Sequence, residues 1–286
     1  MSLKIVVLVK QVPDTKNVTS DAMTPDGIVN RAVLPAIINP EDLNALEEAL
    51  KIKESIGAII TVVTLGPPAA VKVLKECLYR GADDVILVTD QKFAASDTLA
   101  TSYALKCAIE RIGDYDLIFC GRQAIDGDTA QVGPQIAEKL NINQLTCVSE
   151  VVTADNTSIA VRKAIEGGYE VVRSKFPVLI TVTADANEPR SPSARQVMVY
   201  KNITTRCAAS NDAYMHPDLK VCSHIKEWHF DDIKADPKSC GLSGSATKVK
   251  NIESVVLAAR NIRQVSNDEI SISNLVNELV AEHILG

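Results

Sequence analysis

Residues 116–134 read Asp-Leu-Ile-Phe-Cys-Gly-Arg-Gln-Ala-Ile-Asp-Gly-Asp-Thr-Ala-Gln-Val-Gly-Pro, and they change from an apolar run to a polar loop that contains glycines. The apolar residues 116–120 predict a buried strand, and the pattern that follows predicts a helix over 129–140. The loop therefore lies between the carboxyl end of a strand and the start of a helix. Ligands bind at that position in open α/β sheets, and the N–H groups of a helix start bind anions.

Apolar strands alternate with helices through the first half of the chain. We expect strands at residues 3–9, 58–65, 85–88 and 116–120, and helices at 42–55, 69–79, 98–112 and 129–140. This alternation predicts parallel βαβ units with right-handed crossovers. Because the strands are apolar throughout, helices should cover both faces of the sheet. The predicted fold class is α/β, with a parallel Rossmann-like sheet.

The second half of the chain departs from this alternation. Closely spaced strands are expected at 145–153, 157–163, 169–174 and 177–183. Turns at Asp155-Asn156 and Gly167-Gly168 make them β-hairpins. The hairpins either extend the same sheet or form a small second one.

The C-terminal part of the chain is irregular from residue 187 to residue 250. Residues 272–285 regain helical spacing, with Ser271 or Ser273 as the expected N-cap. We expect a nucleotide-binding α/β domain over residues 1–205 and a C-terminal arm over 206–286. The arm either folds back on its own domain or packs with its helix on a partner subunit.

Composition excludes several classes of function. A net charge of −6 argues against general binding to nucleic acid or to anionic membranes. No apolar run is long enough for membrane insertion, and a strand begins almost at the first residue without a signal-peptide layout. We therefore expect a cytoplasmic location. Cys77, Cys107, Cys120 and Cys147 lie in apolar patterns and are expected to be buried, reduced thiols.

No catalytic set is visible in the sequence. The four histidines all follow residue 206, and no Ser-His-Asp elbow is present. Cys222 and His224 lack a second pair of ligands for zinc. We expect neither catalytic residues nor a metal site, and a protein that holds a cofactor fits better than a hydrolase.

The loop after residue 120 contains the strongest candidate site. Asp128 fits an N-cap, and Gln131 completes a pattern like a capping box. The N–H groups of residues 129–132 would then face the mouth of the sheet, and Thr129 could donate its hydroxyl to a phosphate. Gly127 and Gly133 would allow a ligand to approach the backbone closely. An ordinary capped helix remains an equal alternative on the local pattern.

Three further loops should meet the same rim of the sheet. Asn39-Pro40-Glu41-Asp42 is a helix start in which Asn39 is either a cap or a partner for an adenine edge. Residues 64–67, Thr-Leu-Gly-Pro, end a strand, and residues 96–98, Ser-Asp-Thr, begin a helix. The topology of a parallel sheet brings these loops together.

At these residues the chain resembles the β subunit of electron-transfer flavoproteins over nearly its full length. The resemblance rests on six segments: residues 9–14, 39–42, 64–67, 121–134, 165–168 and 187–190. It implies an adenine-nucleotide-hydrolase-like domain, paired with an α subunit, that holds either AMP or a second FAD. By positional match the nucleotide contacts are Val9, Lys10, Asn39, Asp42, Leu65, Gly66, Gln123, Ala124, Ile125, Asp126, Gly127, Asp128, Thr129, Ala130, Gln131, Val132, Gly133 and Pro134.

Two features favour FAD over AMP. AMP-binding relatives carry Asp-Asp-Asp-Cys-Asn where this chain has Asp-Gly-Asp-Thr-Ala at 126–130, so Gly127 removes bulk and charge beside the phosphates. Ser96, Asp97 and Thr98, together with residues 241–247, resemble the electron-bifurcating branch, which carries FAD in β. Arg122 is expected to place positive charge near the flavin ring or the phosphates, or to form a surface salt bridge.

The resemblance implies a route for electrons. NADH would be the transient donor, oxidised only within the complex. One electron would pass to the α-subunit FAD and on to a flavin-dependent dehydrogenase of acyl-CoA or 2-hydroxy-acid type, and the other to ferredoxin. Residues 190–201 match the stretch that recognises the dehydrogenase. The alternatives are a non-bifurcating subunit with structural AMP, and a non-redox ATP-binding protein of the stress type, which the long arm disfavours.

Overall fold

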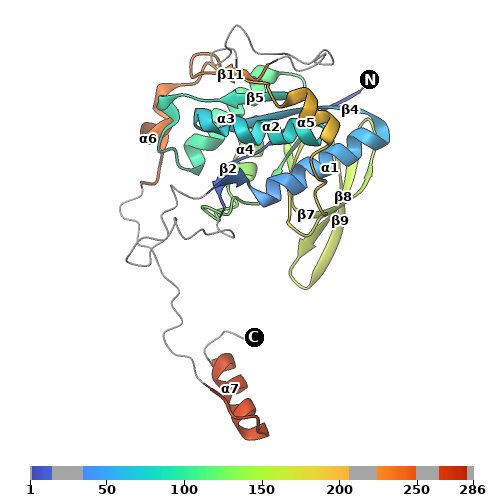
Figure 1. The fold of residues 1–286 in the computed structure, drawn as a ribbon, viewed down its shortest axis with the longest axis vertical. Coiled ribbons are helices and arrows are strands. Elements are labelled where there is room, and N and C mark those ends of the chain that lie inside the picture. The colour runs from blue at the N-terminus through green and yellow to red at the C-terminus, as the bar shows by residue number, and fades with distance from the viewer. Residues whose placement is uncertain (1, 15–34, 206–223, 249–263, 282–286) are drawn as a thin grey trace.

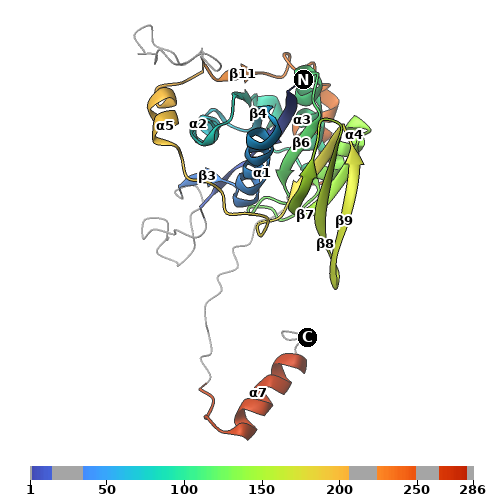
Figure 2. The same ribbon diagram turned by 90° about the vertical axis from the view of Figure 1, so that its right-hand side faces the viewer.

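A computed structural model of the chain describes residues 2–14, 35–205, 224–248 and 264–281. Its centre is a nine-stranded sheet in the order β11-β5-β4-β1-β6-β10-β7-β8-β9. Figures 1 and 2 show helices packed around this sheet. All pairings from β11 to β7 are parallel, and β8 and β9 add antiparallel pairings at one edge. The predicted α/β class with a mostly parallel sheet is confirmed.

The elements follow the predicted alternation closely. The sheet consists of β1 (Leu3–Leu8), β4 (Ala58–Leu65), β5 (Asp84–Val88), β6 (Leu117–Gly121), β7 (Asn143–Ala154), β8 (Ser158–Ile165), β9 (Gly168–Lys175), β10 (Val178–Val182) and β11 (Lys226–Trp228). The helices are α1 (Pro40–Ile56), α2 (Val71–Arg80), α3 (Thr98–Ile112), α4 (Val132–Leu140), α5 (Ala194–Tyr200), α6 (Gly241–Gly244) and α7 (Glu269–Ala281). Short 3-10 turns precede α2, α3 and α6, at Pro68–Ala70, Gln91–Phe93 and Pro237–Ser239. A separate two-stranded sheet pairs β2 (Gln11–Pro13) with β3 (Ala36–Ile38).

The sheet separates two hydrophobic cores, as strands apolar on both faces require. Ile5 and Val7 of β1 point to one core, which contains apolar side chains of α1 and α2. Val6 and Leu8 point to the other core, which contains side chains of α3 and α4. The prediction that helices cover both faces is therefore confirmed.

The hairpins extend the main sheet, which settles the alternative that the sequence left open. β10 follows β9 in sequence but lies between β6 and β7. The register shifts between Ile180 and Val182. There Cys147, at a φ of 57°, donates its N–H to Thr181 Oγ1 at 3.0 Å.

Part of the C-terminal arm folds back on the domain. β11 pairs in parallel with β5, and α6 packs against α3. In both ribbon views α7 lies apart from the sheet (Figures 1 and 2). The predicted N-cap of this helix is wrong: α7 begins at Glu269, and Asp268 Oδ1 accepts the N–H of Ser271 at 2.9 Å.

Candidate functional site

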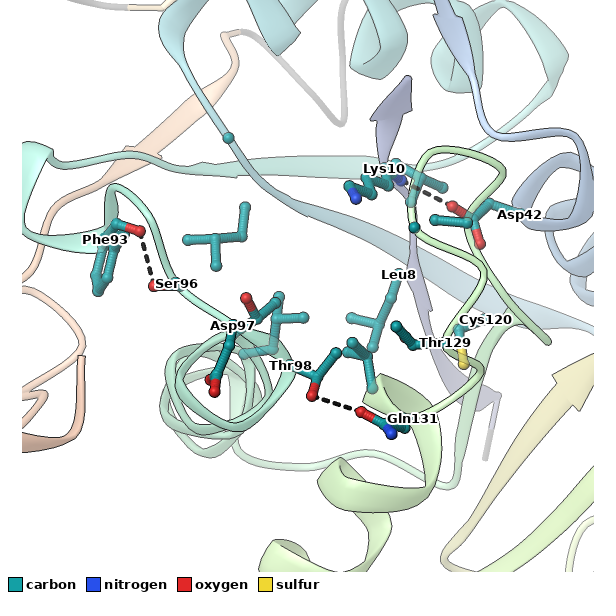
Figure 3. Close-up of a pocket in the computed structure, with 18 of the residues that line it drawn as sticks. Leu8, Lys10, Asp42, Phe93, Ser96, Asp97, Thr98, Cys120, Thr129 and Gln131 are labelled. Atoms are coloured by element: carbon teal, nitrogen blue, oxygen red, sulfur yellow. Dashed lines mark hydrogen bonds between the residues drawn. The ribbon is translucent and has the colours of Figure 1, made fainter. Parts of the chain in front are cut away.

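The carboxyl ends of the central parallel strands open into one pocket of about 1000 Å³, shown in Figure 3. Most of the predicted nucleotide contacts line it: Val9, Lys10, Asp42, Leu65, Gly66, Ser96, Asp97, Thr98, Arg122, Gln123, Ala124, Gly127, Asp128, Thr129, Ala130, Gln131, Val132 and Gly133. Asn39, Ile125, Asp126 and Pro134 do not line it. The four predicted loops thus meet at one rim.

Asn39 supports the pocket from behind. Its side chain makes no capping hydrogen bond to α1, although Pro40 occupies the first helical turn as predicted. Instead Asn39 Nδ2 donates to the carbonyl of Gln123 at 2.8 Å, and Asn39 Oδ1 accepts the N–H of Ile125 at 3.1 Å. Asn39 is the N-cap residue of α1 by position, as predicted, but these bonds engage both ends of its buried amide, so its side chain shapes the loop after β6.

The two acids in the first turn of α1 also hold this loop. Glu41 accepts the N–H of Gln123 at 2.8 Å and pairs with Arg122 Nη2 at 3.1 Å. Asp42 Oδ1 accepts the N–H of Gly121 at 2.8 Å, and Asp42 Oδ2 accepts the N–H of Lys10 at 2.8 Å. Asp42 therefore joins the ends of β1 and β6.

Burial dominates the chemistry of Asp42. It raises the pKa of the carboxyl to about 7, against the opposing effect of the N–H groups of Gly121 and Lys10. Gly121 is required at this contact, because a Cβ there would lie 2.6 Å from Asp42 Oδ1. Close packing of β6 on α1 thus places a titratable group at the base of the pocket.

Two basic side chains line the same end of the pocket. Lys10 Nζ contacts both carboxylate oxygens of Asp126 at 2.7 Å. Arg122 forms the salt bridge to Glu41, while its Nε is buried without a partner among the described residues. Lys10 is therefore held by Asp126 within the loop, and Arg122 by Glu41 of α1.

The segment after Ile125 differs from the prediction. α4 begins at Val132, its N-cap is Gln131, and Asp128 is not a cap. Asp128 and Ala130 instead adopt left-handed φ angles of 47° and 53°. Asp128 accepts a hydrogen bond from Gln123 Nε2 at 3.0 Å. The tight turn of an extended loop replaces the first helical turn that we expected.

This loop nevertheless presents backbone donors. Among the described residues, none accepts a hydrogen bond from the N–H groups of residues 129–133. These five residues all line the pocket. Such unpaired donors attract an anion as a helix start does. Anion binding at this loop stays a prediction, and the geometry that presents the donors differs from the predicted helix start.

Gly133 has a packing role. A Cβ at this position would lie 2.8 Å from Thr181 Cγ2 and 2.9 Å from Cys120 Sγ. Because Gly133 has no side chain, α4 can pack closely against β6 and β10. The Cβ position of Gly133 faces this packing contact and not a ligand. Gly127 is different, because a Cβ there would meet no atom within 4 Å.

The start of α3 forms the opposite wall. Asp97 is its N-cap and accepts the N–H of Ala100 at 3.0 Å, so the predicted helix start is confirmed. Asp97 Oδ2 also accepts the N–H of Thr247 at 2.9 Å. Burial would raise the pKa of Asp97, but the N–H groups of Ala100 and Thr247 outweigh it and hold this pKa below its usual value. Thr98 Oγ1 donates to Gln131 Oε1 at 2.8 Å, which closes the rim between α3 and the loop (Figure 3).

Comparison with known proteins identifies the family. The electron transfer flavoprotein domain matches residues 26–205. The electron transfer flavoprotein subunit beta of Thermoanaerobacterium thermosaccharolyticum is 41% identical, over 99% of this chain and 100% of the relative. The chain belongs to the electron transfer flavoprotein family. It is similar over its full length to proteins named as the β subunit of that family, as the resemblance predicted.

Other relatives in this family carry names that mention reductases. Subunit CarD of the caffeyl-CoA reductase-Etf complex of Acetobacterium woodii is 42% identical, over 86% of each chain. The acryloyl-CoA reductase electron transfer subunit gamma of Anaerotignum propionicum is 37% identical, over 99% of this chain and 100% of the relative. The match to the family domain leaves out β1, β11 and residues 245–247, although all three contribute to the pocket or its wall.

The sequence did not predict one end of the pocket. Glu227 and His229 at β11 line it, as do these residues after β5: Thr89, Asp90, Gln91, Phe93, Ala94 and Ala95. The polar residues Thr89 and Asp90 follow a parallel strand, so the rule that found the other loops could have found these. β11 has only three residues and lies beyond an irregular stretch, so no periodicity marked it.

The remaining expectations about composition have mixed outcomes. Cys77, Cys107 and Cys120 are buried as expected, and Cys147 is half-buried. Among the described helices, none has both the length and the apolar character needed to cross a bilayer. Cys222 lies outside the described residues.

Proposed function

We propose that this chain holds FAD in the pocket and works as the β subunit of an electron-bifurcating heterodimer. The observation that carries this proposal is the run of unpaired N–H donors at residues 129–133, beside Lys10 and Arg122. A diphosphate needs this combination of backbone donors and nearby cations. Lys10 is held by Asp126, so a bound phosphate would share it with that carboxylate.

Two observations favour FAD over AMP. A mononucleotide fills only part of a pocket of about 1000 Å³ that extends from β6 to β11. Gly127 lines that pocket and faces open space, so no carboxylate lies where a second phosphate would add negative charge. Both features suit a dinucleotide.

When bound, FAD would supply the hydride and single-electron chemistry. The chain would bind the diphosphate at residues 129–133 and orient it through the loop that Asn39, Glu41 and Asp42 hold. Arg122 would keep a positive charge near the phosphates or the flavin ring. This chemistry would require no catalytic side chain from this chain. We expect NADH oxidation only in the assembled complex.

The proposed partners are an α subunit with its own FAD, a flavin-dependent dehydrogenase and ferredoxin. The names of two relatives include caffeyl-CoA reductase and acryloyl-CoA reductase, which favours the acyl-CoA type over the 2-hydroxy-acid type. Within the stretch 190–201, Arg190 pairs with Glu47 and Glu54 of α1. Met198 on α5 is 56% exposed and is the apolar side chain best placed to contact the dehydrogenase.

Reduction of ferredoxin by NADH tests this function. The purified αβ complex, together with the dehydrogenase and an α,β-unsaturated acyl-CoA as its electron acceptor, should reduce ferredoxin with NADH, and omission of that acceptor should stop the reduction. NADH oxidation without ferredoxin reduction would contradict bifurcation. No NADH oxidation at all would favour the alternative of a non-bifurcating carrier with AMP. The stress-type alternative is not proposed, because the chain belongs to a different family.

A further inference from the structure

A second, smaller groove of about 410 Å³ lies between α3, α4 and α6, outside the nucleotide pocket. Leu99 and Tyr103 of α3 line it, together with Lys139 of α4 and Lys238 of the turn before α6. The charged residues in this lining are both lysines, so the groove is positive although the whole chain has a net charge of −6. It therefore favours a partner with a negatively charged surface.

The two lysines are available to such a partner. Among the described residues, no acid forms a salt bridge with Lys139 or Lys238. Asp236 accepts the backbone N–H of Lys238 at 3.0 Å, but its side chain does not line the groove. Leu99 is 41% exposed beside these lysines, and Leu242 on α6 is 54% exposed. Apolar side chains with a charged rim are the composition of a protein interface, and a small one suits a transient electron-transfer contact.

Close backbone packing fixes the floor of the groove. A Cβ at Gly241, where φ is 56°, would lie 2.4 Å from the carbonyl oxygen of Lys92 after β5. A Cβ at Gly244 would lie 2.1 Å from the carbonyl carbon of Ser239. The segment that carries Lys238 is therefore preformed, which limits the entropy that docking would cost.

The groove and the nucleotide pocket share a wall. Thr98 of α3 lines the pocket, and its neighbour Leu99 lines the groove. Asp97, which lines the pocket, donates its N–H at 2.9 Å to Oγ of Ser245, which lines the groove. A cofactor in the pocket and a partner in the groove would thus be separated by one layer of residues. Short separation favours electron transfer, because its rate falls steeply with distance.

The groove lies across the sheet from the surface proposed for the dehydrogenase. Ile136 and Ala137 of α4 belong to one hydrophobic core, and Val199 of α5 belongs to the other. Figure 2 shows α5 and α4 on opposite sides of the sheet. A partner in the groove would therefore not compete with the dehydrogenase at α5.

We propose that this groove docks a small electron carrier with an acidic surface, which is the ferredoxin of the proposed function. Its carboxylates would contact Lys139 and Lys238, and its apolar surface would contact Leu99 and Leu242. The oxidised carrier would gain the one electron that the reduced flavin loses, and no covalent bond would form or break. This inference rests on the proposed function, because FAD in the pocket is the source of that electron.

Binding of oxidised ferredoxin to the flavin-loaded αβ complex tests the groove without turnover. The probe is a ferredoxin of net negative charge, and surface plasmon resonance measures its association rate constant at low salt. Lys139→Glu with Lys238→Glu should lower this constant roughly tenfold and flatten its dependence on salt. Lys238→Glu alone should lower it roughly threefold, and arginine at both positions should preserve it.

Lys72→Glu with Lys175→Glu is the matched control, because it makes the same change in net charge. Both lysines are exposed and lie outside the pocket and the groove. This control should bind ferredoxin at the unmodified rate, and flavin content should be equal in all complexes.

Four results would overturn the inference: no binding of ferredoxin to the unmodified complex, unchanged association in the groove variants, equal slowing in the control, or loss of the α subunit from the groove variants. The last result would assign the groove to the α subunit. The proposed function fails separately, if the unmodified complex binds ferredoxin but does not reduce it with NADH, the dehydrogenase and the acyl-CoA acceptor.

Discussion

Asp42 is the residue on which the base of the pocket depends most directly, because its two oxygens join β1 to β6. Its carboxyl has a pKa of about 7 in the fold, against an ordinary value of 3.8. A carboxyl with a raised pKa holds its proton more tightly in the folded state. Its contribution to stability is therefore complete below about pH 4 and is lost as pH rises through about 7.

We expect the free energy of unfolding to fall between about pH 5 and 7, with a contribution from Asp42 of up to about 1.4 kcal/mol per pH unit. Urea unfolding of the nucleotide-free chain at several pH values measures this slope. Asp42→Asn should remove that contribution. It should also lower stability overall, because an amide oxygen replaces only one of the two acceptors. Equal slopes in both proteins would show that Asp42 does not titrate in this range.

We propose that Gly127 determines which nucleotide the pocket binds, FAD or AMP. Gly127→Asp should lower FAD affinity roughly tenfold or more, since a like charge near a phosphate costs about 1 to 4 kcal/mol. AMP should remain bound, because it lacks the second phosphate. Gly127→Ala is the control, because its methyl group meets no atom within 4 Å. Equal FAD content in all three αβ complexes would contradict this role.

Residue types in the site could be predicted, but their partners could not. Asn39 and Asp128 are residue types that commonly cap helices. The side chains of both instead form hydrogen bonds with Gln123 in the loop after β6. Local propensity does not encode contacts between residues more than eighty positions apart, such as Asn39 and Ile125. Gly133 shows the same limit, because its requirement comes from Thr181 on a distant strand.

At the scale of elements, α5 is the proposed docking surface for the dehydrogenase. Arg190 anchors the segment before α5 through Glu47 and Glu54, and Met198 on α5 is exposed. Met198→Glu should slow electron transfer to the dehydrogenase roughly tenfold or more, because a charge would be buried at the contact. Stopped-flow reduction of the dehydrogenase measures this rate. Met198→Leu should keep the rate, and flavin content should not change in either variant.

The apolar side chains of α7 are the proposed contact with the α subunit. Ile272, Val276 and Val280 recur every four residues and are 44–51% exposed. Val276→Asp should weaken αβ association, measured by analytical ultracentrifugation, because burial of an unpaired charge is costly. Asn277→Asp adds the same charge outside this stripe and should have little effect. Equal weakening by both substitutions would contradict a specific apolar contact.

Most elements could be predicted because long periodic patterns determine them. The bounds of α3 agree with the expected helix at 98–112, and β4 agrees with the expected strand at 58–65. α4 starts three residues later than expected, because Asp128 and Ala130 take left-handed conformations. β11 could not be predicted, since pairing with β5 determines this three-residue strand.

At the scale of the whole molecule, the sheet places two different chemistries in one pocket. Backbone donors and two cations lie near β1 and β6, and a carboxylate with a histidine lies at β11. A parallel sheet produces this arrangement because all its carboxyl ends meet at one rim. We propose that this pocket holds FAD.

The nucleotide content of the purified αβ heterodimer tests that claim most directly. Acid extraction followed by chromatography separates FAD from AMP and counts both against protein. We predict two FAD and no AMP per heterodimer, one FAD in each subunit. One FAD with one AMP per heterodimer would contradict it.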